Sequence, residues 1–139
     1  MPKILLVDDN ETLREMYCVA LKKSNFIVET LAGADTDFAD KVAAINPDLV
    51  SLDILMPGGV NGYQALKILK IDSRTKNIPV FLLSNKGERE DITKGISLGA
   101  VDYLIAAKHL PDEVVRFFSA YLSMPGTYEP QYVHESYYR

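Results

Sequence analysis

Short apolar runs alternate along this chain with longer stretches whose apolar residues recur every three or four positions. The first run, Lys3–Val7, is apolar from its second residue onward, as expected for a strand buried on both faces of a sheet. The next stretch, Glu11–Lys23, has the spacing of one helix face, carried by Leu13, Met16, Tyr17, Ala20 and Leu21. The start of the chain therefore predicts a buried strand followed by an amphipathic helix.

The same alternation continues to residue 122. We expect four more strands at residues 26–31, 48–52, 79–83 and 101–105, and four more helices at 35–45, 63–71, 88–98 and 111–122. Pro47 and Gly99 punctuate two helix ends, and Pro111 suits the first turn of the last helix. This order predicts an α/β fold: a doubly wound, five-stranded parallel sheet of strand order 2-1-3-4-5, flanked by five helices.

The last part of the chain breaks this pattern. Residues 123–139 contain proline, glycine and four tyrosines without periodicity. We therefore divide the chain into a domain at 1–122 and a tyrosine-rich C-terminal tail at 123–139 that lies outside the core. Tyrosines favour docking because they bury a large area at modest entropic cost, whereas irregular chain ends are often disordered, and the sequence leaves both possibilities open.

Composition excludes some classes of function. The length of 139 residues fits one domain, and the net charge of -4 argues against non-specific nucleic-acid binding, which needs a basic face. The first apolar run is too short for a signal peptide or a membrane span, so we expect a cytoplasmic protein without membrane insertion. The single cysteine, Cys18, is expected to be a small buried residue of the first helix.

Polar side chains follow three of the predicted strands. Asp8 and Asp9 end the first strand, Asp53 follows the third, and Ser84 follows the fourth. Ligands of open parallel sheets bind at this carboxyl edge, and three crowded carboxylates would raise one another's pKa. A bound cation is the simplest remedy, and oxygen ligands without a nearby histidine or cysteine favour Mg²⁺.

Such a site also suits phosphoryl chemistry. A carboxylate can attack phosphorus to form an acyl phosphate, while a metal and a hydroxyl such as that of Ser84 stabilise the phosphoryl oxygens. Singly, these residues also have structural explanations, because Asp-Asp-Asn after a strand caps a helix well and Asp53 before a loop suits a turn. Their combination at three strand ends favours the functional interpretation.

Four stretches together resemble the receiver domains of response regulators from two-component phosphorelays, which have a flavodoxin-like fold. They are residues 4–9, 52–58, 80–84 and 99–104, and the resemblance spans about residues 3–122. It implies a phosphoacceptor protein that is not an enzyme beyond self-catalysed phosphorylation and dephosphorylation. The implied cofactor is Mg²⁺, and the implied partners are a sensor histidine kinase or phosphotransfer protein and a downstream protein target. We expect no output domain and no direct nucleic-acid contact in this chain.

The resemblance also assigns roles within the acidic site. Asp53 would be the phosphoacceptor. Asp9, Asp53 and the backbone carbonyl of Leu55 would bind Mg²⁺ directly, and Asp8 would act mostly through water. Leu55 and Lys86 occupy the two variable positions that tune the lifetime of the acyl phosphate in the family.

A second set of implied roles concerns the switch. Ser84 would move towards the phosphoryl group, and Tyr103, the switch aromatic, would swing inward. The face formed by the fourth helix, fifth strand and fifth helix would be the output surface.

Two departures from the family pattern stand out. The family carries a lysine three residues after the switch aromatic, usually followed by proline, whereas this chain has Ala106 and Ala107. That lysine normally pairs with the phosphoryl group, so Lys86 or Lys108 would have to substitute for it. Residues 58–62 form a loop one residue longer than usual, which its glycines tolerate.

These observations leave two main hypotheses and one weaker one. The first is a phosphoaccepting receiver, which the intact acid set favours. The second is a degenerate receiver that binds proteins independently of phosphorylation, which Ala106 favours. The third is a flavin-binding or hydrolytic enzyme on the same fold, but the sequence has no glycine-rich phosphate loop, and His109 and His134 are isolated and expected at the surface.

Overall fold

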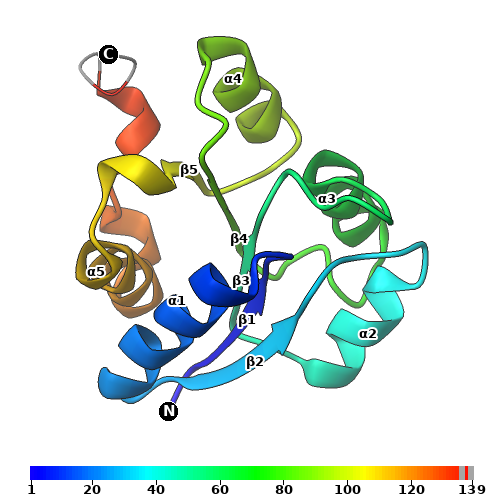
Figure 1. Ribbon diagram of the computed structural model, residues 1–139, viewed down its shortest axis with the longest axis horizontal. Coiled ribbons are helices and arrows are strands. Elements are labelled where there is room, and N and C mark those ends of the chain that lie inside the picture. Colours follow the sequence, from blue (N-terminus) through cyan, green and yellow to red (C-terminus); the bar gives the residue numbers. More distant parts are fainter. Residues whose placement is uncertain (135–136, 138–139) are drawn as a thin grey trace.

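The predicted sheet is confirmed in the computed structural model, which describes residues 1–134 and residue 137. Its strands are all parallel and lie in the order β2-β1-β3-β4-β5 (Figure 1). Their bounds are β1 Lys3–Val7, β2 Ile27–Leu31, β3 Leu49–Leu52, β4 Val80–Ser84 and β5 Asp102–Ile105. Each starts or ends within one residue of its predicted position.

Five α-helices within the described residues connect and cover these strands. They are α1 Glu11–Lys23, α2 Phe38–Ile45, α3 Gly62–Ile71, α4 Arg89–Ser97 and α5 Pro111–Ser123. Helices α1 and α5 cover one face of the sheet, and α2, α3 and α4 cover the other (Figure 1). No helix among the described residues is long and apolar enough to cross a bilayer.

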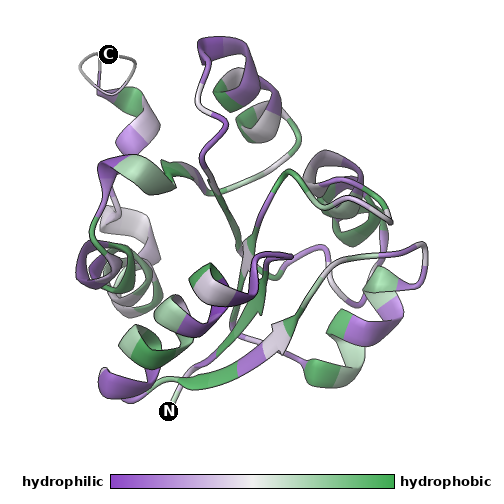
Figure 2. Ribbon diagram, viewed as in Figure 1, coloured by the Kyte–Doolittle hydropathy of each residue, from purple (hydrophilic) through white to green (hydrophobic). Residues whose placement is uncertain are grey.

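The sheet carries apolar side chains on both faces, as the continuous apolar runs predict. In β1, Ile4 and Leu6 belong to the cluster under α1 and α5, whereas Leu5 and Val7 belong to the cluster under α2, α3 and α4. Figure 2 shows hydrophobic residues in the central strands and polar residues on the outer sides of the helices, whereas the edge strand β2 also carries polar residues. Each fully buried aliphatic side chain contributes roughly 1.5–3 kcal/mol, so these two clusters dominate the stability of the fold.

Local chemistry fixes most helix ends. The Asn10 side chain accepts a hydrogen bond from the Leu13 N–H at 3.0 Å and caps α1, and Asn61 and Gln64 form a capping box at the start of α3. Helix α2 begins at Phe38, three residues later than expected. The reason is tertiary, because the preceding loop is held by a hydrogen bond of 3.0 Å from the Val60 N–H to the Ala34 carbonyl.

Two side chains of α1 test the predicted helix face. Cys18 is buried, as expected. Met16, which was expected to face inward, is 39% exposed. The buried face of α1 is therefore narrower than the spacing of apolar residues in the sequence indicated.

The tail does not lie outside the core, which differs from the expectation. Two short 3₁₀ turns, Pro125–Thr127 and Gln131–Val133, carry it back beside β5, and Tyr137 is only 7% exposed and joins the cluster under α2, α3 and α4. Figure 1 shows this segment leaving α5 and running past β5. Periodicity could not reveal this packing, because single tyrosines and backbone N–H groups make the contacts. The division of the chain at residue 122 stays a prediction.

Candidate functional site

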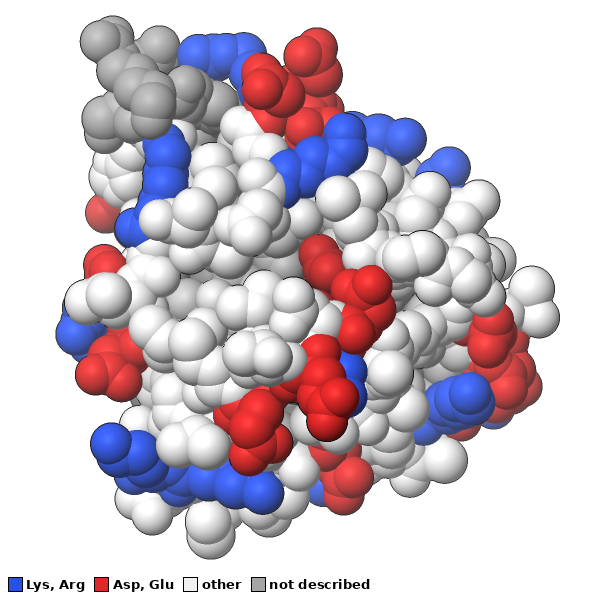
Figure 3. Space-filling model, viewed as in Figure 1, with Lys and Arg blue, Asp and Glu red and all other residues white. Residues whose placement is uncertain are grey.

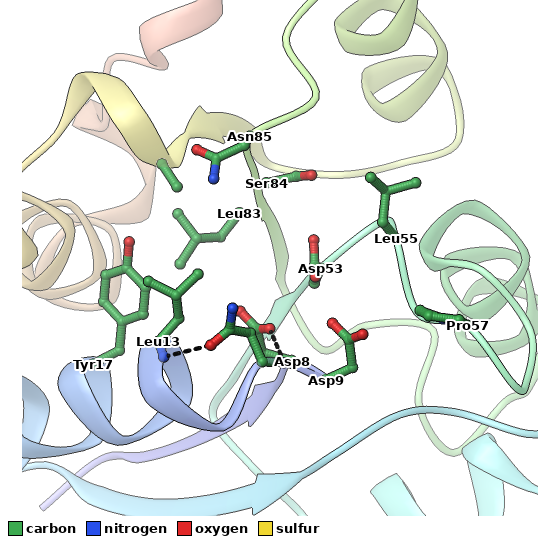
Figure 4. A pocket seen from close by; sticks show the side chains of 12 residues that line it. Asp8, Asp9, Leu13, Tyr17, Asp53, Leu55, Pro57, Leu83, Ser84 and Asn85 are labelled. Carbon is green, nitrogen blue, oxygen red and sulfur yellow. Dashed lines mark hydrogen bonds between the residues drawn. The ribbon is translucent and has the colours of Figure 1, made fainter.

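The three predicted carboxylates converge at the carboxyl edge of the sheet. One carboxylate oxygen from each of Asp8, Asp9 and Asp53 lies within 4.8 Å of the others. In Figure 3, acidic side chains gather in the middle of the face shown, over this edge of the sheet. Figure 4 shows the close view, in which Ser84 at the end of β4 lies beside the Asp53 carboxylate. The structure thus brings together the site residues that the strand ends indicated.

Strand register places the acids next to one another. Val7 and Leu52 are paired residues of β1 and β3, and the Asp53 N–H donates to the Val7 carbonyl at 3.0 Å, so Asp8 and Asp53 leave adjacent strands at the same level. The Asn10 N–H donates to Asp8 Oδ1 at 2.8 Å and orients that carboxylate. The acidic cluster is therefore a consequence of sheet geometry and one local turn.

The backbone of the loop after β3 packs closely against Asp53. The Ile54 N–H donates to Asp53 Oδ1 at 2.8 Å, which leaves Oδ2 as the oxygen without that bond. Gly62 approaches so closely that a Cβ atom at position 62 would lie 2.2 Å from the Asp53 carbonyl oxygen. Only glycine fits there, so this residue of the longer loop has a positional role that the sequence did not reveal.

Electrostatics make this pocket favourable for a cation. Burial, and next the charge of Asp8, raise the pKa of Asp53 to about 6, although the Ile54 N–H and the Ser84 hydroxyl act in the opposite direction. Burial also raises the pKa of Asp8, and the negative charge of Asp9 adds to this rise. The charged forms of these acids are thus disfavoured until a cation or proton neutralises them.

The donor atoms fit Mg²⁺. Three carboxylates offer hard oxygen ligands in one pocket of about 310 Å³, and Leu55 lines the same pocket beside Asp53. Within the described residues, the lining contains neither histidine nor cysteine, and neither lysine nor arginine. Mg²⁺ accepts this set readily because it binds one or two carboxylates and otherwise keeps water or phosphate oxygens.

Tyr103, the residue expected to be the switch aromatic, faces inward. Tyr103 is fully buried, and its hydroxyl donates to the backbone carbonyl of Lys86. Gly95 of α4 makes room for it, because a Cβ atom there would lie 3.2 Å from the Tyr103 ring and 2.4 Å from a methyl group of Leu82. Ser84 is buried too, and its Oγ accepts a hydrogen bond of 3.3 Å from the Lys86 N–H.

Among the residues that the structure describes, no lysine lines the pocket in place of the one that position 106 lacks. Ala106 lines the acidic pocket, but the Lys86 ammonium pairs with Asp91 at 2.8 Å. The chain turns into a 3₁₀ segment, Ala106–Lys108, directly after β5. Lys108, the other lysine expected as a substitute, donates instead to the Tyr137 carbonyl and lies over the Tyr137 ring.

Three residues near the site were missed by sequence reasoning. Asn85 and Tyr17 line the same pocket (Figure 4). Arg14 donates from Nη1 to the Asp8 backbone carbonyl at 2.7 Å, and its charge lowers the pKa of Asp8 in part. Its position on the first turn of α1, the helix that follows Asp8 and Asp9 in the chain, was the available signal.

Comparison with known families identifies one match. Residues 4–114 match the response regulator receiver domain. The matched range contains every site residue described above.

Known proteins give the same picture. The chain is 40% identical over 116 residues to the phosphate regulon transcriptional regulatory protein PhoB of Klebsiella pneumoniae, a match that covers 81% of this chain and 48% of PhoB. It is 34% identical over 103 residues to the DNA-binding response regulator MtrA of Mycobacterium leprae, covering 74% of this chain and 44% of MtrA. The chain thus spans about half the length of these relatives.

A solved structure shares the fold. The chemotaxis protein CheY4 of Vibrio cholerae superposes with a TM-score of 0.76 at 25% identity, covering 86% of this chain and 98% of CheY4.

Proposed function

The chain belongs to the response-regulator receiver domain family, and from this premise we propose that it accepts a phosphoryl group on Asp53 beside a bound Mg²⁺ ion. The family acts in two-component signalling and is not a class of ordinary enzymes. We place this chain in the cytoplasm, with a sensor histidine kinase or a phosphotransfer protein as the donor. Its output is a changed α4–β5–α5 surface that a downstream protein recognises.

The convergence of three carboxylates on one pocket carries this proposal. Nothing in fold stability calls for three acids with oxygens within 4.8 Å, since burial and mutual repulsion raise the pKa of Asp53 to about 6. Asp9, Asp53 and the Leu55 backbone would hold Mg²⁺, with Asp8 acting through water. The ion would neutralise negative charge on the phosphoryl oxygens.

The chain's own residues define the transfer step. Asp53 Oδ1 is held by the Ile54 N–H, so Oδ2 is the oxygen that attacks phosphorus. The new O–P bond forms as the bond from phosphorus to the donor's leaving group breaks, and a phosphohistidine donor regains a proton on its imidazole. Ser84, buried beside Asp53, would then donate a hydrogen bond from its hydroxyl to a phosphoryl oxygen.

One observation supports the alternative function of a phosphorylation-independent binding module. Ala106 stands where the family has its phosphoryl-binding lysine. Without that lysine, phosphorylation would change the output surface little. Absence of nucleic-acid contact by these residues stays a prediction, since two relatives are named as transcriptional or DNA-binding regulators.

Beryllofluoride, which mimics an aspartyl phosphate, separates the two functions. We expect Mg²⁺-dependent chemical-shift changes around Asp53 in the parent protein and none in Asp53→Asn. As the control, Asp112→Asn removes an exposed acid outside the pocket and should respond like the parent protein. Binding that leaves the α4–β5–α5 amides unshifted would favour the phosphorylation-independent module, and no binding at all would contradict the phosphoacceptor assignment.

A further inference from the structure

We propose that the outer edge of β5 is a docking surface built for a tyrosine-bearing segment, and that the chain's own tail occupies it in cis. While docked, the tail closes part of the α4–β5–α5 surface to other proteins. This inference rests on the proposed function only in treating that surface as the output surface. The tail segment here means residues 124–134 and Tyr137.

Asp102 is the first anchor of this docking surface. Its side chain is fully buried at the start of β5, where Oδ2 accepts hydrogen bonds from the Tyr128 hydroxyl at 2.6 Å and the Gln131 N–H at 2.8 Å. Oδ1 accepts a bond of 2.8 Å from the Tyr103 N–H and one of 3.4 Å from the Tyr132 N–H. Most of the groups that satisfy this buried carboxylate thus belong to the tail.

Burial of Asp102 makes the tail its specific partner. Burial raises the pKa of Asp102, and the hydrogen bonds from the tail oppose that rise. A buried carboxylate without donors is strongly unfavourable, so the site is complete only when a segment supplies a hydroxyl and backbone N–H groups. A plain apolar surface would not need these donors, and this distinguishes a built site from incidental packing.

Tyr137 is the second anchor, at the other end of β5. Its hydroxyl accepts a hydrogen bond of 2.6 Å from the Ile105 N–H and lies 3.0 Å from His109 Nε2. The rings of Tyr137 and His109 are stacked with centroids 5.6 Å apart, and the His109 side chain is only 7% exposed, so it is not the surface residue that the sequence indicated. Lys108 donates to the Tyr137 carbonyl.

Asp102 and Tyr137 accept hydrogen bonds from backbone N–H groups on the β5 edge of the sheet. N–H groups two residues apart on a strand point to the same side, and those of Tyr103 and Ile105 face the outer edge of β5, which is the last strand of the sheet. Asp102 accepts from the first and Tyr137 from the second. Unpaired edge groups readily recruit another strand, so the tail fills the place of an added partner.

Tyr128 fixes the path of the tail between the anchors and α5. Its ring packs edge-on against Phe81 of β4 at 5.5 Å and against Tyr121 of α5 at 5.7 Å. The tail therefore lies over β5 and α5, which are two of the three elements of the proposed output surface.

Docking is also connected to the acidic pocket. The Ile105 N–H that Tyr137 holds belongs to the residue directly before Ala106, which lines the pocket around Asp53. A shift of this segment on phosphorylation would act on the Tyr137 hydrogen bond. The tail would then be released, and the surface would become available to a protein partner.

Hydrogen exchange of the Ile105 amide in the full chain tests the docking. We expect protection in the parent protein and exchange about tenfold faster in Tyr137→Phe, which keeps the ring and removes the accepting hydroxyl. Glu129→Gln is the matched control, because Glu129 lies in the tail but is exposed and its recorded contact is with His134. Unprotected exchange in the parent protein, or equal exchange in Tyr137→Phe, would overturn the proposal.

Two further measurements identify the occupant. Protection that is independent of protein concentration supports the chain's own tail, whereas protection that falls on dilution would show that a second copy supplies it and would overturn the cis assignment. A synthetic peptide of residues 124–139 should shift the β5 amides of the Tyr128→Phe/Tyr137→Phe double variant and leave the parent protein unchanged. Equal shifts in both proteins would contradict occupancy in cis. None of these tests needs phosphorylation, so their failure and a failure of Asp53 labelling are distinguishable.

Discussion

Asp53 and Asp102 are both withdrawn from water at opposite ends of the sheet, yet their surroundings differ in kind. Burial is the largest cause of the raised pKa of each carboxyl. Asp102 is satisfied by four hydrogen bonds, whereas Asp53 receives the Ile54 N–H on one oxygen, has the Ser84 hydroxyl beside it and faces two other acids in an open pocket. A closed set of donors is typical of a structural acid, whereas a cluster of three carboxylates favours the proposed cation site.

Substitution of Asp102 should have the largest effect on stability. Asp102→Asn replaces one acceptor oxygen by an amide that faces donors from Tyr103, Tyr128 and the tail. We expect a loss of about 2–4 kcal/mol in the free energy of unfolding, measured by urea denaturation. A loss below the error of the measurement would show that the tail does not satisfy this acid in solution.

The second largest effect is expected from Mg²⁺, which should stabilise the protein through the acidic pocket and not through Asp102. At about 100 times its Kd, the ion should raise the stability of the parent protein by roughly 2.7 kcal/mol. The gain in stability should disappear in Asp9→Ala, which removes one of the converging carboxylates. In Asp102→Asn, Mg²⁺ should raise the stability above that of the metal-free variant by the same amount as in the parent protein. Calorimetric melting with Mg²⁺ and with EDTA measures both, and an equal gain in Asp9→Ala would remove Asp9 from the proposed ligands.

Asp53→Asn should change the free energy of unfolding in the opposite direction to Asp102→Asn. The folded pKa of Asp53 is about 6, above its ordinary value of 3.8, so its ionisation opposes folding. That penalty is absent below the unfolded pKa and complete above about pH 6. Near pH 7.5 in EDTA we expect Asp53→Asn to be more stable by about 1–2 kcal/mol, because solvent screens part of the charge of this partly exposed carboxylate.

The pH dependence checks the cause of that gain. The advantage of Asp53→Asn should shrink as the pH falls from about 6 towards 4, because the parent carboxyl then becomes neutral as well. Urea denaturation across this range gives the difference directly. An advantage that stays constant with pH would show that packing, and not charge, separates the two proteins.

Restoring the family lysine should give the smallest effect on stability and a visible effect on coupling. Ala106→Lys places an ammonium beside the acidic pocket, where Lys86 and Lys108 are engaged elsewhere. We expect larger beryllofluoride-induced shifts on the α4–β5–α5 amides with little change in Mg²⁺ affinity. Identical shifts in the two proteins would mean that coupling in this chain does not depend on a lysine at position 106.

The contrast between Asp53 and Asp102 also shows which parts of the site could be predicted from the sequence. The acids after β1 and β3 could be predicted as one site, because the carboxyl ends of adjacent parallel strands meet at one edge. Asp102 could not be identified as an anchor, since a single acid inside a predicted strand carries no signal of partners 26 to 30 positions away.

The same limit applies to helix α2, the lysines and the tail. The start of α2 depends on a hydrogen bond between the loops at Ala34 and Val60, and the engagement of Lys86 and Lys108 depends on where Asp91 and Tyr137 lie in space. The tail lacks periodicity because its contacts come from individual side chains. Hydrophobic periodicity and the positions of proline and glycine predict helices and strands, whereas these features depend on tertiary contacts.

Labelling with a small phosphodonor tests the central assignment most directly. The parent protein incubated with acetyl phosphate and Mg²⁺ should gain one phosphoryl group by intact-mass spectrometry, located to Asp53 by peptide mapping, and EDTA should prevent the gain. Asp53→Asn should remain unlabelled while Asp112→Asn is labelled like the parent protein. A parent protein that stays unlabelled, or an Asp53→Asn protein that gains the same mass, would contradict the account.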